Sequence, residues 1–177
     1  EYDGTSWTAG GTSNTGSYSH ASAGTTQDAG LIYGRKTPPT SVKTEYYDGS
    51  AWTEVADMGG AARYFPTGIG TSVSALSGGG YGAAASGGVT TTEEWNFDST
   101  IAAGAWATGG SLNTPRTQGA AVGIQTAGLH AGGNPDLADS EEYDGSSWTE
   151  GDNLNTAGDY GWASFGIQTA AVYAGRP

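Results

Sequence analysis

The chain of 177 residues has no cysteine, only six lysines and arginines, and no apolar run long enough to cross a membrane. The lack of cysteine excludes disulfides, thiol catalysis and cysteine-based zinc sites. Because nucleic-acid binding needs clustered basic side chains, the six scattered cations exclude that class of partner. The net charge of −12 disfavours insertion into anionic membranes, and we interpret it as a source of solubility.

Helical patterns are also nearly absent. No stretch sustains apolar residues at helical spacing, and 32 glycines interrupt the chain. Glycine richness accompanies disorder in some proteins, but disordered chains are poor in aromatic residues. Here 6 Trp, 10 Tyr and 3 Phe recur in phase with a repeat. We therefore predict one folded, all-β domain over residues 1–177.

The repeat is an aromatic residue, an acidic turn and a tryptophan. Clear copies lie at residues 1–8, 47–54 and 142–149, and a stretched copy runs from 94–98 to Trp106. An Asp-Gly pair between two aromatic-bearing runs is typical of a β-hairpin. A period in the forties built from strands indicates a propeller or a similar array.

Each repeat unit contains four β segments. In the third unit these are residues 117–123, 127–133, 140–143 and 147–150. The pentapeptide Gly-Ile-Gln-Thr-Ala, at 123–127 and again at 166–170, predicts the turn between the first two segments. The first segment of each unit is rich in Ala, Ser and Gly, as a crowded innermost strand requires.

This order of segments resembles the kelch repeat: a small-residue strand, a strand ending in glycines, a strand with Tyr-Asp and a strand with Trp. The resemblance covers the whole chain, and it extends to glycine-rich kelch-like arrays of environmental and phage-associated proteins. It implies a β-propeller, in which four-stranded sheets form blades around a central channel.

The two ends of the chain carry complementary halves of one unit. Residues 1–9 supply the third and fourth segments, and residues 159–176 supply the first two. We therefore expect a propeller of four blades, each of four antiparallel strands, whose N- and C-terminal strands close one blade. A segment of a larger propeller and one half of a dimeric ring are the alternatives.

Most conspicuous side chains have a structural interpretation. The repeated aromatic residues are expected to be buried between blades, and Asp3, Asp48 and Asp144 to form turns. His20 and His130 lie on different strand types, so a shared metal site is not expected. We predict no catalytic residue, metal or cofactor; calcium near Asp136 and Asp139 was the one candidate, and the spacing lacks the EF-hand pattern. The aromatic set is Tyr2, Trp7, Tyr47, Trp52, Trp95, Trp106, Tyr143 and Trp148.

The residues that lead into the innermost strand differ between units, whereas the turns do not. Such positions are free to serve a ligand, and they would lie at the mouth of the channel. The alternative is that they only plug the channel. The predicted ligand-binding residues are Tyr18, His20, Arg63, Tyr64, Arg116, Tyr160 and Trp162.

This pattern favours a non-enzymatic binding or adhesion module that recognises a surface glycan or a protein. A structural component of a larger assembly, such as a phage fibre or a surface filament, is the second hypothesis, and a glycan-active enzyme is the third. Membrane insertion is not expected, an oligomer is compatible with the pattern, and an extracellular or virion-associated location is favoured. No signal peptide is visible, so we expect a processed product or a piece of a longer chain.

Overall fold

The computed structural model describes residues 1–36, 40–83, 87–98, 103–160 and 163–175, and within these the chain contains β-strands and no helix. The strands are β1 (Ala21–Thr26), β2 (Ala29–Arg35), β3 (Ser41–Tyr47), β4 (Trp52–Val55), β5 (Arg63–Tyr64), β6 (Thr67–Gly70), β7 (Ser74–Gly78), β8 (Tyr81–Gly82), β9 (Thr92–Asp98), β10 (Ala103–Thr108), β11 (Ala120–Ile124), β12 (Ala127–Ala131), β13 (Ser140–Tyr143), β14 (Trp148–Glu150), β15 (Ala163–Ile167) and β16 (Ala170–Ala174). The all-β prediction is confirmed for the described residues.

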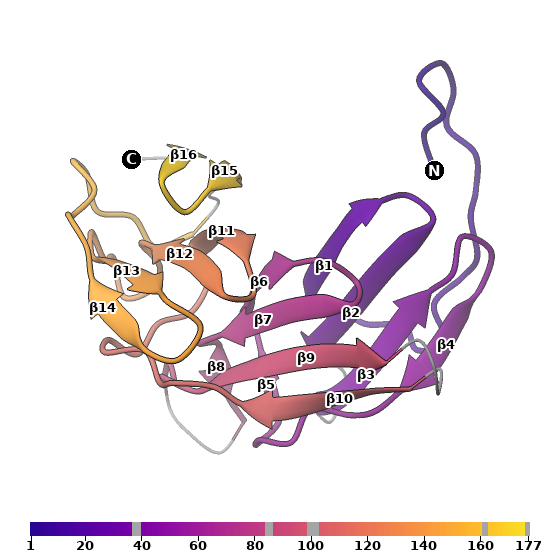
Figure 1. Cartoon of the computed structure of the whole chain (residues 1–177), viewed down its shortest axis with the longest axis horizontal. Coiled ribbons are helices and arrows are strands. Elements are labelled where there is room, and N and C mark those ends of the chain that lie inside the picture. The colour runs from indigo at the N-terminus through magenta and orange to yellow at the C-terminus, as the bar shows by residue number, and fades with distance from the viewer. Residues whose placement is uncertain (37–39, 84–86, 99–102, 161–162, 176–177) are drawn as a thin grey trace.

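Three four-stranded antiparallel sheets form the body of the molecule (Figure 1). Their strand orders are β1-β2-β3-β4, β6-β7-β9-β10 and β11-β12-β13-β14. The first strand of each sheet contacts the first strand of the next. Strand β6 lies against both β1 and β11, and β11 lies against β15. The sheets therefore follow one another around a shared inner side, which is a propeller-like arrangement.

The Asp-Gly pairs form hairpin turns between the third and fourth strands, as predicted. In the third sheet the Asp144 carboxylate accepts hydrogen bonds of 2.8 Å from the backbone amides of Ser146 and Ser147. These bonds lower the pKa of Asp144 to about 2. Gly145 follows with a φ of 95°, a left-handed conformation that glycine adopts without strain.

Aromatic side chains fill the spaces between neighbouring sheets. Trp95 is fully buried in a core cluster that joins the first two sheets, and Trp148 lies in the cluster between the second and third. The indole of Trp106 donates to Thr44 of the preceding sheet at 3.0 Å, and that of Trp148 donates to Thr92 at 3.2 Å. Large rings thus set the angle between sheets, and their indole N–H groups fix the register.

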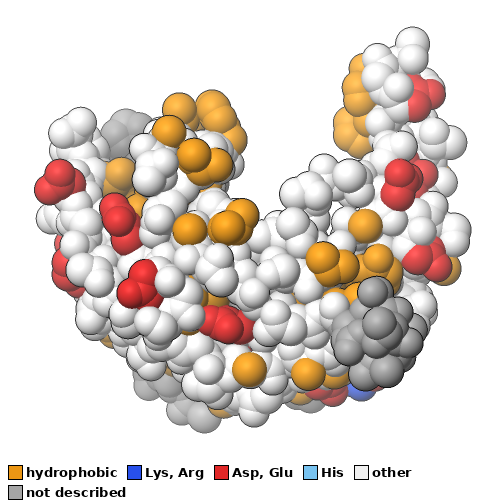
Figure 2. Space-filling model, viewed as in Figure 1, with side chains coloured by type: hydrophobic (Ala, Val, Ile, Leu, Met, Phe, Trp, Pro, Cys, Tyr) orange, Lys and Arg blue, Asp and Glu red, His pale blue; other side chains and the backbone are white. Residues whose placement is uncertain are grey.

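The two ends of the chain do not close a blade. The sheet β15-β16 has two strands, and at the N-terminus Tyr2 pairs with Trp7. The ends lie on opposite arms of an open, U-shaped molecule (Figures 1 and 2). The predicted pairing of residues 1–9 with residues 159–176 is therefore wrong for this structure, since the packing between sheets holds the arms apart.

The open ends also change the burial of the repeated aromatics. Tyr47, Trp95, Tyr143 and Trp148 are buried, and Trp52 and Trp106 are partly buried, as their repeat position predicts. Tyr2 and Trp7 are exposed, against the prediction, because among the described residues no strand pairs with the N-terminal hairpin to cover their rings.

Candidate binding surface

The segments that lead into the inner strands share an unusual backbone. Ser19, Phe65 and Gln118 occupy the same repeat position, and their φ angles are 60°, 56° and 60°. The amide of Phe65 donates to the carbonyl of Ser19 at 2.8 Å, and the amide of Gln118 donates to the carbonyl of Phe65 at 3.3 Å. These bonds connect three successive sheets. A bulky residue at positive φ is uncommon, and such conformations concentrate at functional sites.

Aromatic rings gather beside this backbone. The ring of Tyr64 lies 5.0 Å from that of Tyr81 and 5.4 Å from that of Phe65, measured between centroids. Strands β5 and β8 hold the two tyrosines together, because Tyr64 pairs with Tyr81 in a two-stranded ladder. All three rings are partly exposed. The three rings form a partly exposed aromatic cluster that carries two phenol hydroxyls.

Lys36 completes this group. Its ammonium nitrogen lies 4.5 Å from the centroid of the Tyr64 ring, within the range of a cation–π contact. Its backbone exchanges two hydrogen bonds with Tyr18, whose side chain is more than half exposed. We name Tyr18, Lys36, Tyr64, Phe65 and Tyr81 the mouth cluster.

Lys36 is also distinctive in its charge. Within the described part of the chain, every other lysine or arginine forms an ion pair with a carboxylate. The mouth cluster therefore combines aromatic faces with a partly exposed cation that has no carboxylate partner among the described residues, on a molecule whose net charge is −12. The sequence analysis included Tyr18 and Tyr64 in the site but missed Lys36, Phe65 and Tyr81.

Arg63 and Arg116, which were predicted to bind a ligand, are buried and ion-paired in the structure rather than exposed. Each guanidinium pairs with a buried glutamate of a four-stranded sheet: Arg63 with Glu93 of β9 at 2.8 Å, and Arg116 with Glu141 of β13 at 2.7 Å. A side chain that is enclosed and paired in this way cannot reach a ligand at the surface. The two arginines share a repeat position because each pairs with the buried glutamate of a sheet.

The first sheet contains an equivalent ion pair from a different position. Arg35, the last residue of β2, pairs with Glu45 at 2.5 Å, and both side chains are fully buried. The residue at the position of Arg63 and Arg116 is here Ser17. In each sheet the glutamate also accepts backbone N–H groups of the segment before the inner strand, for example Asn113 at 2.6 Å from Glu141. The glutamates of the ion pairs thus hold in place the segments that carry the mouth cluster.

The two histidines have separate environments, as predicted. His130 is buried against Trp148 and near Arg116, and burial lowers its pKa to about 3. Its neutral ring belongs to the core. His20 is exposed; desolvation by nearby atoms, with a smaller effect of the Arg35 guanidinium, lowers its pKa below the ordinary value. No contact places His20 within the mouth cluster.

The remaining predicted residues are not joined to the mouth cluster. Tyr160 is exposed, and no described contact connects its ring to the cluster. Trp162 lies outside the described residues. The structure therefore brings Tyr18 and Tyr64 together, through Lys36, and separates them from the other predicted positions.

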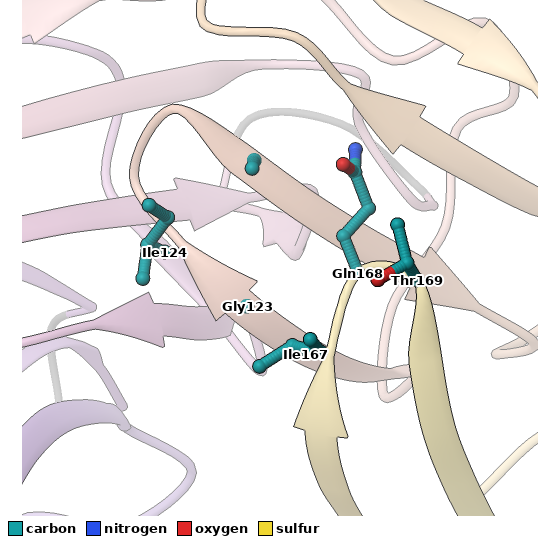
Figure 3. A pocket seen from close by; sticks show the side chains of 6 residues that line it. Gly123, Ile124, Ile167, Gln168 and Thr169 are labelled. Atoms are coloured by element: carbon teal, nitrogen blue, oxygen red, sulfur yellow. The ribbon is translucent and has the colours of Figure 1, made fainter.

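A concave feature lies between the third sheet and β15-β16. The two identical turns form an open pocket of about 250 Å³, lined mainly by apolar groups that include Ile124, Ala127 and Ile167 (Figure 3). The amide of Gln168 is committed to the third sheet, because it donates to the carbonyls of Gly128 and Tyr143 at 3.2 and 2.9 Å. This pocket offers shape but few polar groups.

No group of three or more His, Asp or Glu side chains is arranged to hold a metal ion in the described part of the chain. The same residues include no helix that is long and apolar enough to cross a membrane.

No protein-family model and no curated protein sequence matches the chain. Among solved structures, the chain is similar to the structure of YjhT, with a TM-score of 0.68 and 13% sequence identity. The similarity covers 86% of this chain and 56% of YjhT, so the chain spans a little over half the length of that protein. At this identity the similarity concerns the fold alone.

Proposed function

We propose that the protein is a non-enzymatic binding module, built from kelch-like propeller repeats, that recognises a surface glycan through the mouth cluster. The observation that carries the proposal is the packing of Tyr64, Phe65 and Tyr81 beside Lys36. Aromatic faces bind the apolar faces of sugar rings, while phenol and ammonium groups bind hydroxyl or carboxylate oxygens.

The surroundings of the cluster support this role. The buried ion pairs and the hydrogen bonds between Ser19, Phe65 and Gln118 hold the segments in place before a ligand arrives. A preorganised surface loses less conformational freedom on binding, which favours affinity. Because the rest of the chain is acidic, the ammonium of Lys36 gives this surface a local preference for glycans with acidic groups.

The test is a glycan array that contains neutral and acidic oligosaccharides, followed by calorimetric titration of the strongest ligand. Tyr64→Ala removes the ring that contacts Lys36, Phe65 and Tyr81, and we expect it to weaken binding by about tenfold or more. Lys36→Gln should weaken acidic ligands more than neutral ones. Absence of any array signal, or full affinity in Tyr64→Ala, would contradict the proposal.

Tyr46→Ala is the matched control. Tyr46 stacks on Phe97 with a centroid distance of 5.5 Å, so the substitution also removes a tyrosine from an aromatic pair. That pair lies on the third strands of two sheets, outside the mouth cluster. We expect Tyr46→Ala to retain wild-type affinity, which separates a loss of ligand contact from a general loss of stability.

A further inference from the structure

The first strands of successive sheets run in the same direction and in the same register. The amide hydrogen bonds of Phe65 and Gln118 join equivalent positions before these strands, and the Ser164 hydroxyl donates to the carbonyl of Ala121, its equivalent in the third sheet, at 3.0 Å. The segments that lead into the strands therefore lie on one side of the molecule, with the mouth cluster. The turns that follow β1, β6, β11 and β15 lie on the opposite side, which we name the turn face.

Acidic side chains mark the turn face. The Asp-Gly hairpins between third and fourth strands also reach it, because Gly49 lies against Asp28 of the β1-β2 turn and Gly145 lies against Thr126 of the β11-β12 turn. A Cβ atom on either glycine would come within 3.4 Å of the neighbouring turn. The exposed acidic residues of these turns are Asp28, Asp48 and Asp144.

The described lysines and arginines lie at the other ends of the strands. Arg35 and Lys36 stand at the end of β2, and Lys43 is near the start of β3, whose first residue pairs with Arg35. Arg63 and Arg116 precede the inner strands β6 and β11. Within the described residues, no cation offsets the carboxylates of the turn face, so its electrostatic potential is negative.

Aliphatic side chains are exposed on the same face. Val73, Ile124 and Ile167 are 45%, 55% and 59% exposed. The sheets of Val73 and Ile124 each have four strands and lie between two other sheets. The exposure of these turns is therefore a property of complete sheets with a neighbour on each side, and Ile167 shares it.

The apolar pocket between the β11-β12 and β15-β16 turns lies on this face, with Ile124 beside it (Figure 3). The equivalent space between the second and third sheets is polar. There Thr71 stands at the position of Ile124. Ser74, at the position of Ala127, donates its hydroxyl to the side-chain carbonyl of Gln125 at 2.7 Å. Since both turns have the same length and pairing, the fold does not require apolar residues at these positions.

The β15-β16 turn is held as the turn of a complete sheet is held. Gln168 donates to two backbone carbonyls of the third sheet, and Gln125 donates to the two equivalent carbonyls of the second sheet, at Ala75 and Trp95. No lining residue of the pocket is charged. An apolar cavity of about 150 Å³ holds a benzene molecule, so a pocket of about 250 Å³ has room for a phenyl ring or a branched alkyl group.

From these observations we infer that the turn face binds a basic segment of a partner protein, and that one large apolar side chain of this segment fills the pocket. The volume and the apolar lining select a phenylalanine or leucine side chain, which is the usual form of an interface anchor. The exposed carboxylates select lysine and arginine around that anchor. Because the turn face lies opposite the mouth cluster, the inference does not depend on the proposed glycan binding.

The test is an NMR titration of the methyl-labelled chain with the acetylated and amidated peptide Lys-Lys-Phe-Lys-Lys. We expect shifts of the methyl signals of Ile124 and Ile167. Alanine in place of the phenylalanine, or glutamate in place of the lysines, should weaken binding by about tenfold or more. No shift of these methyl signals at millimolar peptide would overturn the inference. Equal affinity for the glutamate peptide, or for N-acetyl-phenylalanine amide alone, would overturn the basic partner.

The chain offers its own matched substitutions. Ile124→Thr together with Ile167→Thr introduces the residue that the second sheet has at this position, Thr71, so the turns should fold normally. We expect this double variant to bind the lysine peptide about tenfold more weakly. Val73→Thr is the control, because it also removes an exposed aliphatic side chain from the turn face, and Thr126 occupies its position in the third sheet. Full affinity in the double variant would overturn the inference.

Asp144→Asn tests the acidic component. The asparagine oxygen still accepts the amide hydrogen bonds of the turn, while the charge beside the pocket is removed. We expect the lysine peptide to bind about threefold more weakly, whereas Asp48→Asn, in the same turn of the first sheet, should retain full affinity. An equal effect of both substitutions would contradict a site at this pocket. Tyr64→Ala should leave peptide binding unchanged, so a failure of the glycan proposal and a failure of this inference are distinguishable.

Discussion

Arg116 gives the sharpest test of the buried ion pairs. Its guanidinium donates to Glu141 at 2.7 Å and to the carbonyl of Asp139 at 2.8 Å, with both side chains of the ion pair fully buried. Arg116→Met keeps much of the side-chain volume but leaves the Glu141 carboxylate buried without its countercharge. Breaking such a pair from one side costs about 3–5 kcal/mol.

That cost is a large fraction of the free energy of unfolding, which is about 5–15 kcal/mol for a typical domain. Urea denaturation, followed by tryptophan fluorescence and by circular dichroism, measures it. We expect the midpoint of Arg116→Met to fall sharply. Glu141→Gln in the same chain should restore part of the loss, because its amide oxygen still accepts from the backbone amide of Asn113 while the charge is gone.

Lys43→Met is the control, since Lys43 forms an ion pair with Glu54 that is open to solvent. Surface pairs contribute little, so its midpoint should stay near that of the native chain. If Arg116→Met lowers the denaturation midpoint no more than Lys43→Met, the buried ion pair does not stabilise the fold.

Two further predictions concern packing and pH. Gly104→Ala should destabilise the fold by about 1–3 kcal/mol, because its new methyl carbon would lie 2.2 Å from the Trp95 ring, whereas Gly16→Ala meets no atom within 4 Å and should be neutral in chemical denaturation. Burial lowers the pKa of His130 to about 3, from an ordinary value near 6.5 in the unfolded chain. Below pH 6.5 the unfolded chain therefore binds more protons than the folded chain, and the free energy of unfolding falls as the pH decreases from 6.5 towards 3. Between pH 7 and pH 5 the free energy of unfolding of the native chain should fall by about 2 kcal/mol more than that of His130→Leu. Equal decreases in both chains would show that His130 is protonated in the folded chain as readily as in the unfolded one.

The sequence was sufficient to predict the sheets. The Asp-Gly turn before Trp148 and the glycine at 123 define strands whose pairing the structure reproduces. The repeat also predicted the burial of Trp95 and Trp148, because a ring that recurs in phase meets the same neighbours in each unit.

The misassigned arginines show where repeat comparison failed. Arg63 and Arg116 were grouped with residues that diverge between units, yet they share one repeat position, and Glu93 and Glu141 share another. That joint recurrence of opposite charges was the signal for a structural pair. In the first unit the arginine comes from position 35 instead, which concealed the pattern.

The mouth cluster and the open ends depend on distances that the sequence does not contain. Lys36 and Tyr81 are far apart along the chain, and the fold brings each of them against Tyr64. The phase of the termini predicted that the two ends share one sheet, and the structure places them in separate ones. The angle between sheets, which large buried rings set, decides whether the two ends can meet within one chain.

The most direct test of the proposed function is a structure of the chain soaked with the strongest ligand from the glycan array. The proposal predicts a sugar ring packed on Tyr64 or Tyr81, with the Lys36 ammonium within hydrogen-bond distance of a ligand oxygen. A ligand bound elsewhere, for example in the pocket beside Ile124 and Ile167, would contradict it.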